Sequence, residues 1–412
     1  MGRGGSMRAC HVVYSYFPFD PRVRREVETL HRLEYELDVI AMQEPGEPRV
    51  ETVLGARVHR IPFAVVRGGK VRYAFQYLVF LLAAAALLLV LHIRRRYDIV
   101  HVHSLPDFQV FAALPERILG ARVVLDLHEA MPEIFAARFR LAEEGLWTAL
   151  ARAAEWMSCA FADRVIVVND VIRSLLVGRG VDPRKLVVVM NSPDIHEGMG
   201  RGLATPSVPN LGRGPRIVYV GGINPERDLE VLIRAAARLH RSDGVSLVII
   251  GYGDSDYAER LRALARSEGM GDAFRLLPRV DQNQVLAYLS QSDVGPVTYQ
   301  RNPITELAVP NKVFEYAAVG KPLVIANLRA LRGLFGEAAL YYTAGNAEEL
   351  ASRIAELLRD ERLRRGLAER AREVLDRCSW AIMTERLRRL YEEMLSRAGS
   401  WSSPVSVEGA GR

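Results

Sequence analysis

The stretch TELAVPNKVFEYAAVGKPLVIAN, residues Thr305–Asn327, predicts a loop, a short helix and a buried strand in that order. Pro310 and Asn311 can start the helix, because the first helical turn needs no hydrogen-bond donor from proline. Gly320 suits the left-handed conformation in which helices commonly end, and Leu323–Ala326 is apolar enough for a buried strand. A helix that leads into a buried strand is typical of an α/β fold with a parallel sheet.

Three side chains of this helix indicate one kind of chemistry. Lys312, Glu315 and Tyr316 stand at positions i, i+3 and i+4, so they share one face of the helix. A lysine beside the positive N-terminus of a helix suits an anionic phosphate, and a carboxylate one turn later suits a diol. A surface ion pair on an ordinary helix fits the same spacing. The spacing alone leaves both interpretations open.

Outward from this stretch, apolar runs alternate with helical patterns along the 412 residues, which predicts two or three domains with doubly wound parallel sheets. In the first half the predicted strands are His11–Tyr16, Leu37–Ala41, Val58–Pro62, Ile99–His103, Val123–Leu127, Val165–Val168 and Leu186–Met190. In the second half they are Ile217–Val220, Leu247–Ile250, Phe274–Leu277, Val294–Thr298, Leu323–Ala326 and Leu340–Tyr342.

A stretch rich in glycine, proline and polar residues divides these two sets of strands. It reads HEGMGRGLATPSVPNLGR, from His196 to Arg213, and predicts an interdomain linker. We therefore expect two Rossmann-like domains that face a central ligand cleft. The expected parts are an N-terminal domain (1–196), a linker (197–214), a C-terminal domain (215–379), a terminal helix that crosses back (380–397) and a disordered tail (398–412).

Charge and cysteine content narrow the class of partner and the compartment. The chain has 55 basic and 49 acidic residues, a net charge of +6, which favours anionic partners such as nucleotides or lipid headgroups and does not require nucleic acid. Its cysteines, Cys10, Cys159 and Cys378, are far apart and have no zinc-site spacing. These features, and an N-terminus without the apolar core of a signal peptide, predict a reduced, cytoplasmic setting.

One segment suggests contact with a membrane. Tyr73–Ile93 is nearly apolar and approaches the roughly 20 residues that span a bilayer. A span would place the strands His11–Tyr16 and Ile99–His103 on opposite sides of the membrane, where they could not share one sheet. Two alternatives remain, a fully buried helix and a helix lying in the membrane interface, and the lack of a polar stripe favours the second. Basic residues flank the segment: Arg67, Lys70 and Arg72 before it, and Arg94, Arg95 and Arg96 after it.

In the second half, candidate site residues follow the ends of predicted strands. Gly221 and Gly222 end the strand Ile217–Val220, and a glycine turn between strand and helix exposes backbone N–H groups to a phosphate. Arg227 lies in the expected first turn of the next helix, where a cation complements a bound diphosphate. A tight turn with a surface arginine is the alternative. Further turns carry Gly251, Gly253, Arg279 and Val280, which are also compatible with ordinary βα loops.

In the first half, a helix starts with a cluster of charge. Asp20 is a good N-cap before Pro21, and Arg22 and Arg25 then crowd the positive end of that helix together with Arg24. Mutual repulsion of these arginines needs a compensating anion, such as the phosphate of an acceptor lipid, unless they form a solvated basic face.

Other polar residues follow two strands of the first half. His128 and Glu129 come directly after the strand Val123–Leu127, and Asp107 follows the strand Ile99–His103. Reactive groups gather at such strand ends in parallel sheets, although a lone histidine is more often structural.

The segment PNKVFEYAAVGKPLVIA, supported by YVGG and LDLHE, resembles the nucleotide-sugar-binding part of glycosyltransferase family 4. The resemblance runs from Asp20 to about Leu395 and implies the two-domain GT-B fold. It implies that Glu315 binds the donor ribose and that Lys312 and Arg227 bind the diphosphate. It further implies that His128 contacts the donor sugar or its phosphate, and that loop residues assist. The remaining donor-side residues are Gly221, Gly222, Gly251, Gly253, Arg279, Val280, Glu306 and Asn311.

Two positions lose a charged side chain of the family pattern, and a third exchanges lysine for arginine. The family usually carries a glutamate eight positions before Glu315, where this chain has Leu307, with Glu306 one position away. It also usually carries an arginine where this chain has Gly222, and a lysine where it has Arg227. The pattern D-x-R-V-x-x-E at Asp20 resembles a subgroup without the more usual N-terminal glycine loop.

The resemblance implies a metal-independent, configuration-retaining transfer of a sugar from a UDP-, GDP- or ADP-linked donor to an acceptor hydroxyl, with no cofactor. The acceptor would belong to polysaccharide or glycolipid synthesis and could be lipid-linked, with the protein peripheral on the cytoplasmic face of the membrane. A non-catalytic nucleotide-sugar-binding partner and a sugar-nucleotide epimerase are the alternatives. A dehydrogenase is disfavoured, because no GxGxxG opens a βαβ unit.

Overall fold

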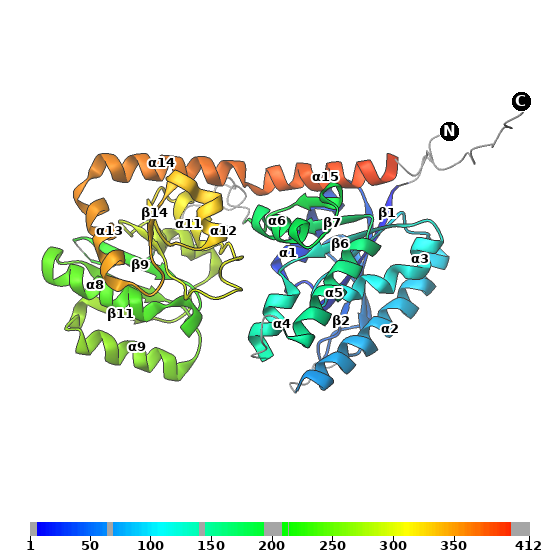
Figure 1. The fold of residues 1–412 in the computed structure, drawn as a ribbon, viewed down its shortest axis with the longest axis horizontal. Helices are drawn as coiled ribbons and strands as arrows, with labels where there is room; N and C mark the ends of the chain where they lie inside the picture. The colour runs from blue at the N-terminus through cyan, green and yellow to red at the C-terminus, as the bar shows by residue number, and fades with distance from the viewer. Residues whose placement is uncertain (1–5, 64–68, 140–144, 193–207, 213, 397–412) are drawn as a thin grey trace, which may run out of the picture. The chain divides into compact units, whose positions relative to one another are not determined.

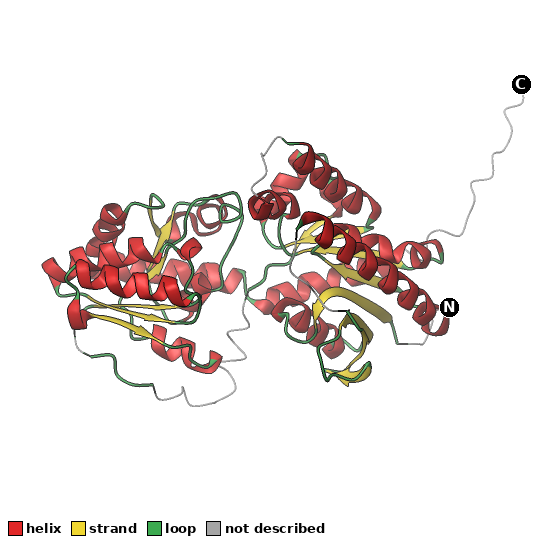
Figure 2. Cartoon of the chain, turned by 90° about the horizontal axis from the view of Figure 1, so that it is seen from below, coloured by secondary structure: helices red, strands yellow, loops and turns green. Residues whose placement is uncertain are grey.

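The computed structural model describes residues 6–63, 69–139, 145–192, 208–212 and 214–396, which form two compact units (Figure 1). Unit 1 contains residues up to Val168, Ile172–Val189 and the chain from Met383 onward. Unit 2 contains Asn169–Val171 and Met190–Ile382. In each unit helices pack on strands (Figure 2). The expected tail and most of the expected linker lie outside the described residues.

Unit 1 is built on an eight-stranded sheet in the order β3-β4-β2-β1-β5-β6-β7-β8, with every neighbouring pair parallel except β3 and β4. The strands are β1 (Arg8–Tyr16), β2 (Glu36–Met42), β3 (Val50–Val53), β4 (Ala56–Ile61), β5 (Ile99–His103), β6 (Arg122–Leu127), β7 (Arg164–Val167) and β8 (Leu186–Val188). The helices are α1 (Pro21–Arg32), α2 (Lys70–Arg95), η1 (Asp107–Ala113), α3 (Leu114–Ile118), α4 (Met131–Phe139), α5 (Leu146–Phe161), α6 (Asp170–Gly178), η2 (Pro183–Lys185) and the greater part of α15 (Trp380–Ser396).

Unit 2 contains two three-stranded parallel sheets, β11-β10-β9 and β12-β13-β14, connected by a single parallel bridge between Ile217 and Val294. The strands are β9 (Arg216–Val220), β10 (Ser246–Ile250), β11 (Phe274–Leu277), β12 (Gly295–Val297), β13 (Leu323–Ala326) and β14 (Leu340–Tyr342). The helices are η3 (Pro225–Arg227), α8 (Leu229–Asp243), α9 (Ser255–Ser267), η4 (Gly271–Ala273), η5 (Gln282–Gln284), α10 (Val285–Leu289), α11 (Lys312–Ala318), α12 (Arg329–Phe335), η6 (Gly336–Ala338), α13 (Ala347–Arg359) and α14 (Glu361–Arg377).

The predicted strands are all present, with ends that differ by at most a few residues. Strand β3 was not predicted, because Val50–Val53 is short and alternates exposed with half-buried residues, so it has no apolar run. It is also the antiparallel strand of the sheet. The expected helix after β9 is corrected: Arg227 belongs to the separate 3-10 turn η3, and α8 begins at Leu229 after a left-handed Asp228.

The order of the strands in each sheet indicates which loops lie at a ligand site. In unit 1 the direction of sheet growth reverses between β1 and β5, and in unit 2 it reverses between β9 and β12. In open parallel sheets, ligands bind outside the carboxyl ends of the strands at such reversal points. The loops after β1, β5 and β6 in unit 1, and after β9 and β12 in unit 2, are therefore where side chains with chemical function are expected.

Helix α2 is apolar on two faces. One face is buried and includes Phe80, Ala84 and Leu88, each with no exposed surface. The other face exposes Phe75 and Leu82, at 64% and 61%. Among the described residues, Arg72–Arg95 is the one helical stretch long and apolar enough to cross a bilayer, judged by length and composition only, and its most apolar window is 28% buried. The alternative of a fully buried helix is therefore wrong.

Candidate active site

In unit 2, three glycines let the loops after β9 and β10 approach each other closely. A Cβ atom on Gly251 would lie 1.8 Å from the carbonyl oxygen of Gly221, and one on Gly253 would lie 1.9 Å from that of Ile223. A Cβ on Gly221 would lie 3.1 Å from the Lys312 Nζ. Gly222 has no such neighbour, since the nearest atom would be 3.4 Å away. These positions thus shape the turn beside Lys312.

Two cations meet beside that turn. The Nζ of Lys312, on α11, lies 3.6 Å from the centre of the Tyr219 ring and 5.9 Å from that of Tyr299. The Arg227 guanidinium lies 4.6 Å from the centre of the same Tyr299 ring. Among the described residues neither cation forms an ion pair, and the Lys312 Nζ and Arg227 Nε have no hydrogen-bond partner. Aromatic faces stabilise the cations only in part, so this corner can accept an anion.

Burial leaves the ammonium group of Lys312 poorly solvated. Burial first, and the nearby Arg227 second, hold the pKa of Lys312 well below its usual value, although Glu315 acts in the opposite direction. A buried ammonium without a partner is costly. A bound anion would replace the missing solvation, and this is the electrostatic property expected of a diphosphate site.

Glu315 and Tyr316 have different roles, although they share a helix. The pKa of Glu315 is raised by burial, against the opposing effects of Lys312 and a hydrogen bond from Gln282. Tyr316 is fully buried and donates its hydroxyl hydrogen bond to the Val218 carbonyl of β9 at 2.7 Å. Tyr316 therefore anchors α11 to the sheet and positions Lys312, while Glu315 remains half-buried near Gln282.

Glu306 and Leu307 lie where the family usually carries the first of its two glutamates, and both make contacts within unit 2. One carboxylate oxygen of Glu306 lies 3.1 Å from the Arg301 Nε, and the other accepts from the Arg329 backbone N–H at 2.6 Å. Leu307 is buried. Both oxygens of Glu306 thus hold α12 and its flanking loop. Asn311 is exposed at the start of α11, and its backbone oxygen accepts from the N–H groups of Phe314 and Glu315.

The loops after β10 and β11 bring an arginine onto an aromatic ring. The Arg279 guanidinium lies 5.0 Å from the centre of the Tyr252 ring, and Tyr252 is 65% exposed. Val280, the next residue, is half-buried. An exposed ring backed by a planar cation can stack on a nucleobase.

In unit 1, Asp20 and Arg22 organise the start of α1. The Asp20 carboxylate caps the helix and accepts from the backbone N–H groups of Arg22 and Val23 at 2.9 and 3.3 Å, as predicted. The Arg22 side chain is buried and donates two hydrogen bonds to Asp126, at 2.7 and 2.6 Å. The expectation that an acceptor anion neutralises Arg22 is therefore wrong, because Asp126 and Glu26, 3.2 Å away, already do so.

His128 lies at the carboxyl end of β6 with a carboxylate behind it. Its Nε2 lies 3.0 Å from an Asp126 oxygen and 3.2 Å from the Nδ1 of His103. Its Nδ1 lies 3.9 Å from the Asp20 carboxylate, and its side chain is 17% exposed. Burial alone would raise the pKa of Asp126, but Arg22, His128 and His103 together hold that pKa well below its usual value. These contacts favour the ionised form of Asp126, whose carboxylate can orient the imidazole of His128.

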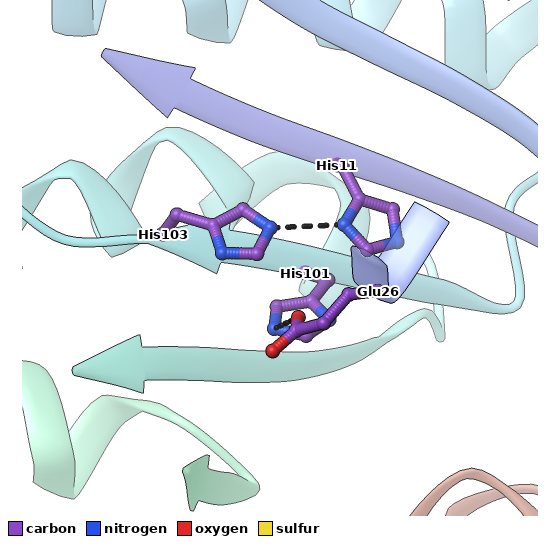
Figure 3. Close-up of side chains that lie close together, drawn as sticks. All are labelled: His11, Glu26, His101 and His103. Atoms are coloured by element: carbon purple, nitrogen blue, oxygen red, sulfur yellow. Dashed lines mark hydrogen bonds and ion pairs between the residues drawn. The ribbon is translucent and has the colours of Figure 1, made fainter. Parts of the chain in front are cut away.

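Behind His128, three histidines and Glu26 form a buried cluster (Figure 3). His11 Nδ1 and His103 Nε2 are 2.9 Å apart, and His101 Nδ1 lies 2.8 Å from the Tyr391 hydroxyl of α15. The His101 and His103 rings stack at 4.5 Å with planes 17° apart, so their nitrogen lone pairs lie in nearly parallel planes. Burial lowers the pKa of all three imidazoles. Burial thus disfavours protonation of these rings, and His103 contacts His128 from the buried side of the cluster.

The remaining acceptor-side residues lie in different surroundings. Asp107 is fully buried at the start of η1, and burial first, then Glu155 and Glu133, raise its pKa well above the usual value. Glu129 is exposed directly after His128, and Arg25 is half-buried on α1.

Three residues of the candidate site were not predicted from the sequence: Asp126, Tyr219 and Tyr299. Asp126 had a detectable signal, because it is a charged residue inside an apolar strand and stands two positions before His128, a spacing that puts both side chains on the same side of an extended chain. The two tyrosines had none, since their proximity to Lys312 and Arg227 comes from segments distant in sequence.

Comparison with known families matches both units. Residues 20–192 match the family described as "Glycosyl transferase 4-like domain", and residues 206–374 match the family described as "Glycosyl transferases group 1". With the two parallel-sheet units, these matches define the class of GT-B glycosyltransferases. The chain belongs to glycosyltransferase family 4.

Individual relatives are distant. A phosphatidyl-myo-inositol mannosyltransferase of Mycobacterium leprae is 29% identical over 45% of this chain and 50% of its own length. A D-inositol 3-phosphate glycosyltransferase of Thermomonospora curvata is 28% identical over 72% of this chain and 71% of its own. Anabaena HepE in complex with UDP-glucose has a TM-score of 0.64 at 15% identity, over 94% of this chain and all of that one. This chain thus spans about half of the first relative, and the structural likeness shows the fold.

Proposed function

We propose that this protein transfers a sugar from a nucleotide-diphosphate sugar to an acceptor hydroxyl. The observation that carries the proposal is the pair of cations on unit 2, Lys312 and Arg227, which flank Tyr299 and have no carboxylate partner among the described residues. Departure of a nucleoside diphosphate develops negative charge, and preorganised cations stabilise that charge. Glu315 is the proposed partner of the ribose.

The proposed transfer has three further features: its stereochemistry, its independence of a metal and a catalytic histidine. The transfer retains the anomeric configuration, as the family resemblance implies. It needs no metal, because Lys312 and Arg227 supply the positive charge at the diphosphate. His128, oriented by Asp126, carries the proposed catalytic contact with the transferred sugar or its phosphate.

The donor and acceptor are proposed as classes. The donor is UDP-, GDP- or ADP-linked; the name of the HepE complex includes UDP-glucose, which supports a nucleotide sugar. The acceptor is a polysaccharide or glycolipid precursor, for which the lipid name of the M. leprae relative offers support. The exposed apolar face of α2 supports peripheral contact with the cytoplasmic face of a membrane.

A thermal-shift screen against UDP, GDP, ADP and their sugars tests the donor, since a ligand of the folded state raises the melting temperature by mass action. We expect one nucleotide series to raise it in the native protein but not in Lys312→Met. No shift with any nucleotide would contradict the proposal.

A second function is favoured by the two departures from the family pattern. Both Glu306 oxygens are engaged within the fold, and Gly222 supplies no cation. A non-catalytic nucleotide-sugar-binding partner would tolerate both. Donor hydrolysis or transfer by the purified protein excludes that function, and conversion of the donor without any acceptor would indicate an epimerase.

A further inference from the structure

A cavity of about 370 Å³ lies in unit 1 between α2, α4, α5 and the loop before η1. This volume falls in the range of small-molecule sites. Among the described residues the wall is made of aromatic and aliphatic side chains, with Arg138 as the one charged lining residue. Characteristic lining residues are Tyr77, Phe108, Ile134, Phe135 and Leu150.

The cavity adjoins the loops that carry His128. Leu105 and Met131 line it, and they follow the carboxyl ends of β5 and β6. The backbone N–H of His128 donates to the hydroxyl of Ser104, the residue before Leu105, at 3.1 Å. A molecule held in the cavity would therefore lie beside the proposed acceptor side of unit 1.

The lining selects hydrocarbon over peptide or sugar. A peptide or a sugar would bury many polar groups against these walls, and each buried polar group without a partner is destabilising. A hydrocarbon chain needs no such partner and gains from leaving water. The chemistry of the wall thus fits an aliphatic chain.

The rim of the cavity is cationic. The Arg138 guanidinium lies 4.5 Å from the centre of the Tyr73 ring and donates to the Tyr73 hydroxyl at 2.6 Å. Arg138 is exposed, and within the described ranges no ion pair engages it. Arg72, also exposed, neighbours Tyr73 on α2. An anionic headgroup complements this rim, and arginine binds phosphate well.

The cavity also opens onto the exposed apolar surface of the unit. Trp147 and Leu150 both line it and are 54% and 51% exposed. On α2, Ala74 lines it next to Phe75, which is 64% exposed. The apolar lining is therefore continuous with exposed apolar side chains, to which a hydrocarbon chain can bind.

We propose that this cavity binds the hydrocarbon chain of a lipid phosphate, with the phosphate at Arg138. If the transfer proposed above takes place, this lipid is the hydrophobic part of the acceptor. Only this assignment as acceptor rests on the proposed function. Chain binding itself does not require the donor site.

Calorimetry with dodecyl phosphate, below its critical micelle concentration, tests the chain. We expect saturable binding of one molecule, weakened roughly fourfold for each methylene removed while the chain still lies in the cavity. Ala154→Trp fills the cavity and should weaken binding by about tenfold or more. Ala153→Trp is the matched control, because Ala153 is exposed on the same helix and does not line the cavity. Should Ala154→Trp fail to fold, Leu150→Arg places a charge in the cavity from a half-exposed position.

A second set of measurements tests whether Arg138 binds the phosphate headgroup. Arg138→Gln should weaken dodecyl phosphate about tenfold, the loss of a charge-assisted hydrogen bond, and leave binding of the uncharged dodecyl maltoside unchanged. Inorganic phosphate alone should not compete measurably. Unchanged dodecyl phosphate affinity in Ala154→Trp or Leu150→Arg would overturn the proposal. So would self-association of the native protein without probe binding, which would show that a second copy covers the cavity.

The outcome is separable from that of the donor site. The nucleotide thermal shift should be the same in Ala154→Trp as in the native protein. Probe binding without any nucleotide shift would refute the proposed transfer and keep the lipid cavity. A nucleotide shift without probe binding would do the reverse.

Discussion

Arg22 and Asp126 form a buried, two-bond ion pair, with the Arg22 Nε and Nη2 donating to both oxygens of the Asp126 carboxylate at 2.7 and 2.6 Å. The pair joins α1 to β6 across 104 residues of sequence. Because Asp126 also lies 3.0 Å from His128, the pair sets the charge behind the candidate catalytic imidazole.

Removal of Arg22 should destabilise unit 1 strongly. Arg22→Met leaves Asp126 buried without its cation, and we expect a loss of about 3–5 kcal/mol in the free energy of unfolding. Hydrogen exchange of the β6 amides measures it locally. Arg24→Met, which removes an exposed pair with Glu28, is the control and should cost at most about 1 kcal/mol. Equal effects of the two variants would contradict the structural role of the pair.

Loss of His128 should lower turnover and spare nucleotide binding. The imidazole belongs to unit 1, whereas the proposed diphosphate cations belong to unit 2. We expect His128→Ala to reduce kcat by on the order of 100-fold or more with unchanged UDP or GDP affinity. His31→Ala, at an exposed histidine of α1, should retain full activity. Full activity of His128→Ala would remove this residue from the mechanism.

Lys312 should be required for diphosphate binding and not for nucleoside binding. Loss of a hydrogen bond from a charged donor costs about 1.5–3 kcal/mol, so Lys312→Met should weaken nucleoside diphosphate binding about ten- to hundredfold. Calorimetry with the diphosphate and with the bare nucleoside separates the two contributions. Lys321→Met changes a nearby half-buried lysine and should leave both affinities intact.

Binding of the diphosphate should take up a proton at Lys312. The pKa of Lys312 in the free protein is lowered by burial and by Arg227, and an adjacent anion raises it again. Uptake should therefore increase as pH rises through the lowered pKa of the free protein and decline again as pH approaches the higher pKa of the bound state, and affinity should fall across this window. Calorimetry in buffers of different ionisation enthalpy measures the uptake. Lys312→Met should abolish it, and identical uptake in that variant would assign the proton to another group.

The exposed face of α2 should mediate membrane binding. Replacing Phe75, Leu78 and Leu82 by serine removes three exposed apolar side chains and should reduce sedimentation with anionic liposomes about tenfold or more. Val50→Ser and Val177→Ser, at exposed sites elsewhere on unit 1, form the control. Added salt should weaken binding by screening the flanking arginines. Equal sedimentation of both sets would leave the face without a membrane role.

Local pattern was enough to predict most elements, because strand and helix periodicities are properties of neighbouring residues. The stripe Val23, Val27 and Leu30 of α1 is fully buried, as is the stripe of α8 that starts at Leu229. The pattern failed at β3, where no apolar run exists. It also failed at Arg227, where a left-handed Asp228 separates η3 from α8.

The sequence by itself determined the α/β architecture, the Asp20 cap and the cation-bearing segment around Lys312, since each depends on residues within a few positions of one another. Only the tertiary structure decided which charges remain available. It pairs Arg22 with Asp126 and uses both oxygens of Glu306. It places Lys312 on the rings of Tyr219 and Tyr299, with no ion pair to a carboxylate within the described part of the chain. The reason is physical: a charge's partner and its desolvation depend on which distant segments pack beside it, and no local spacing encodes that neighbourhood.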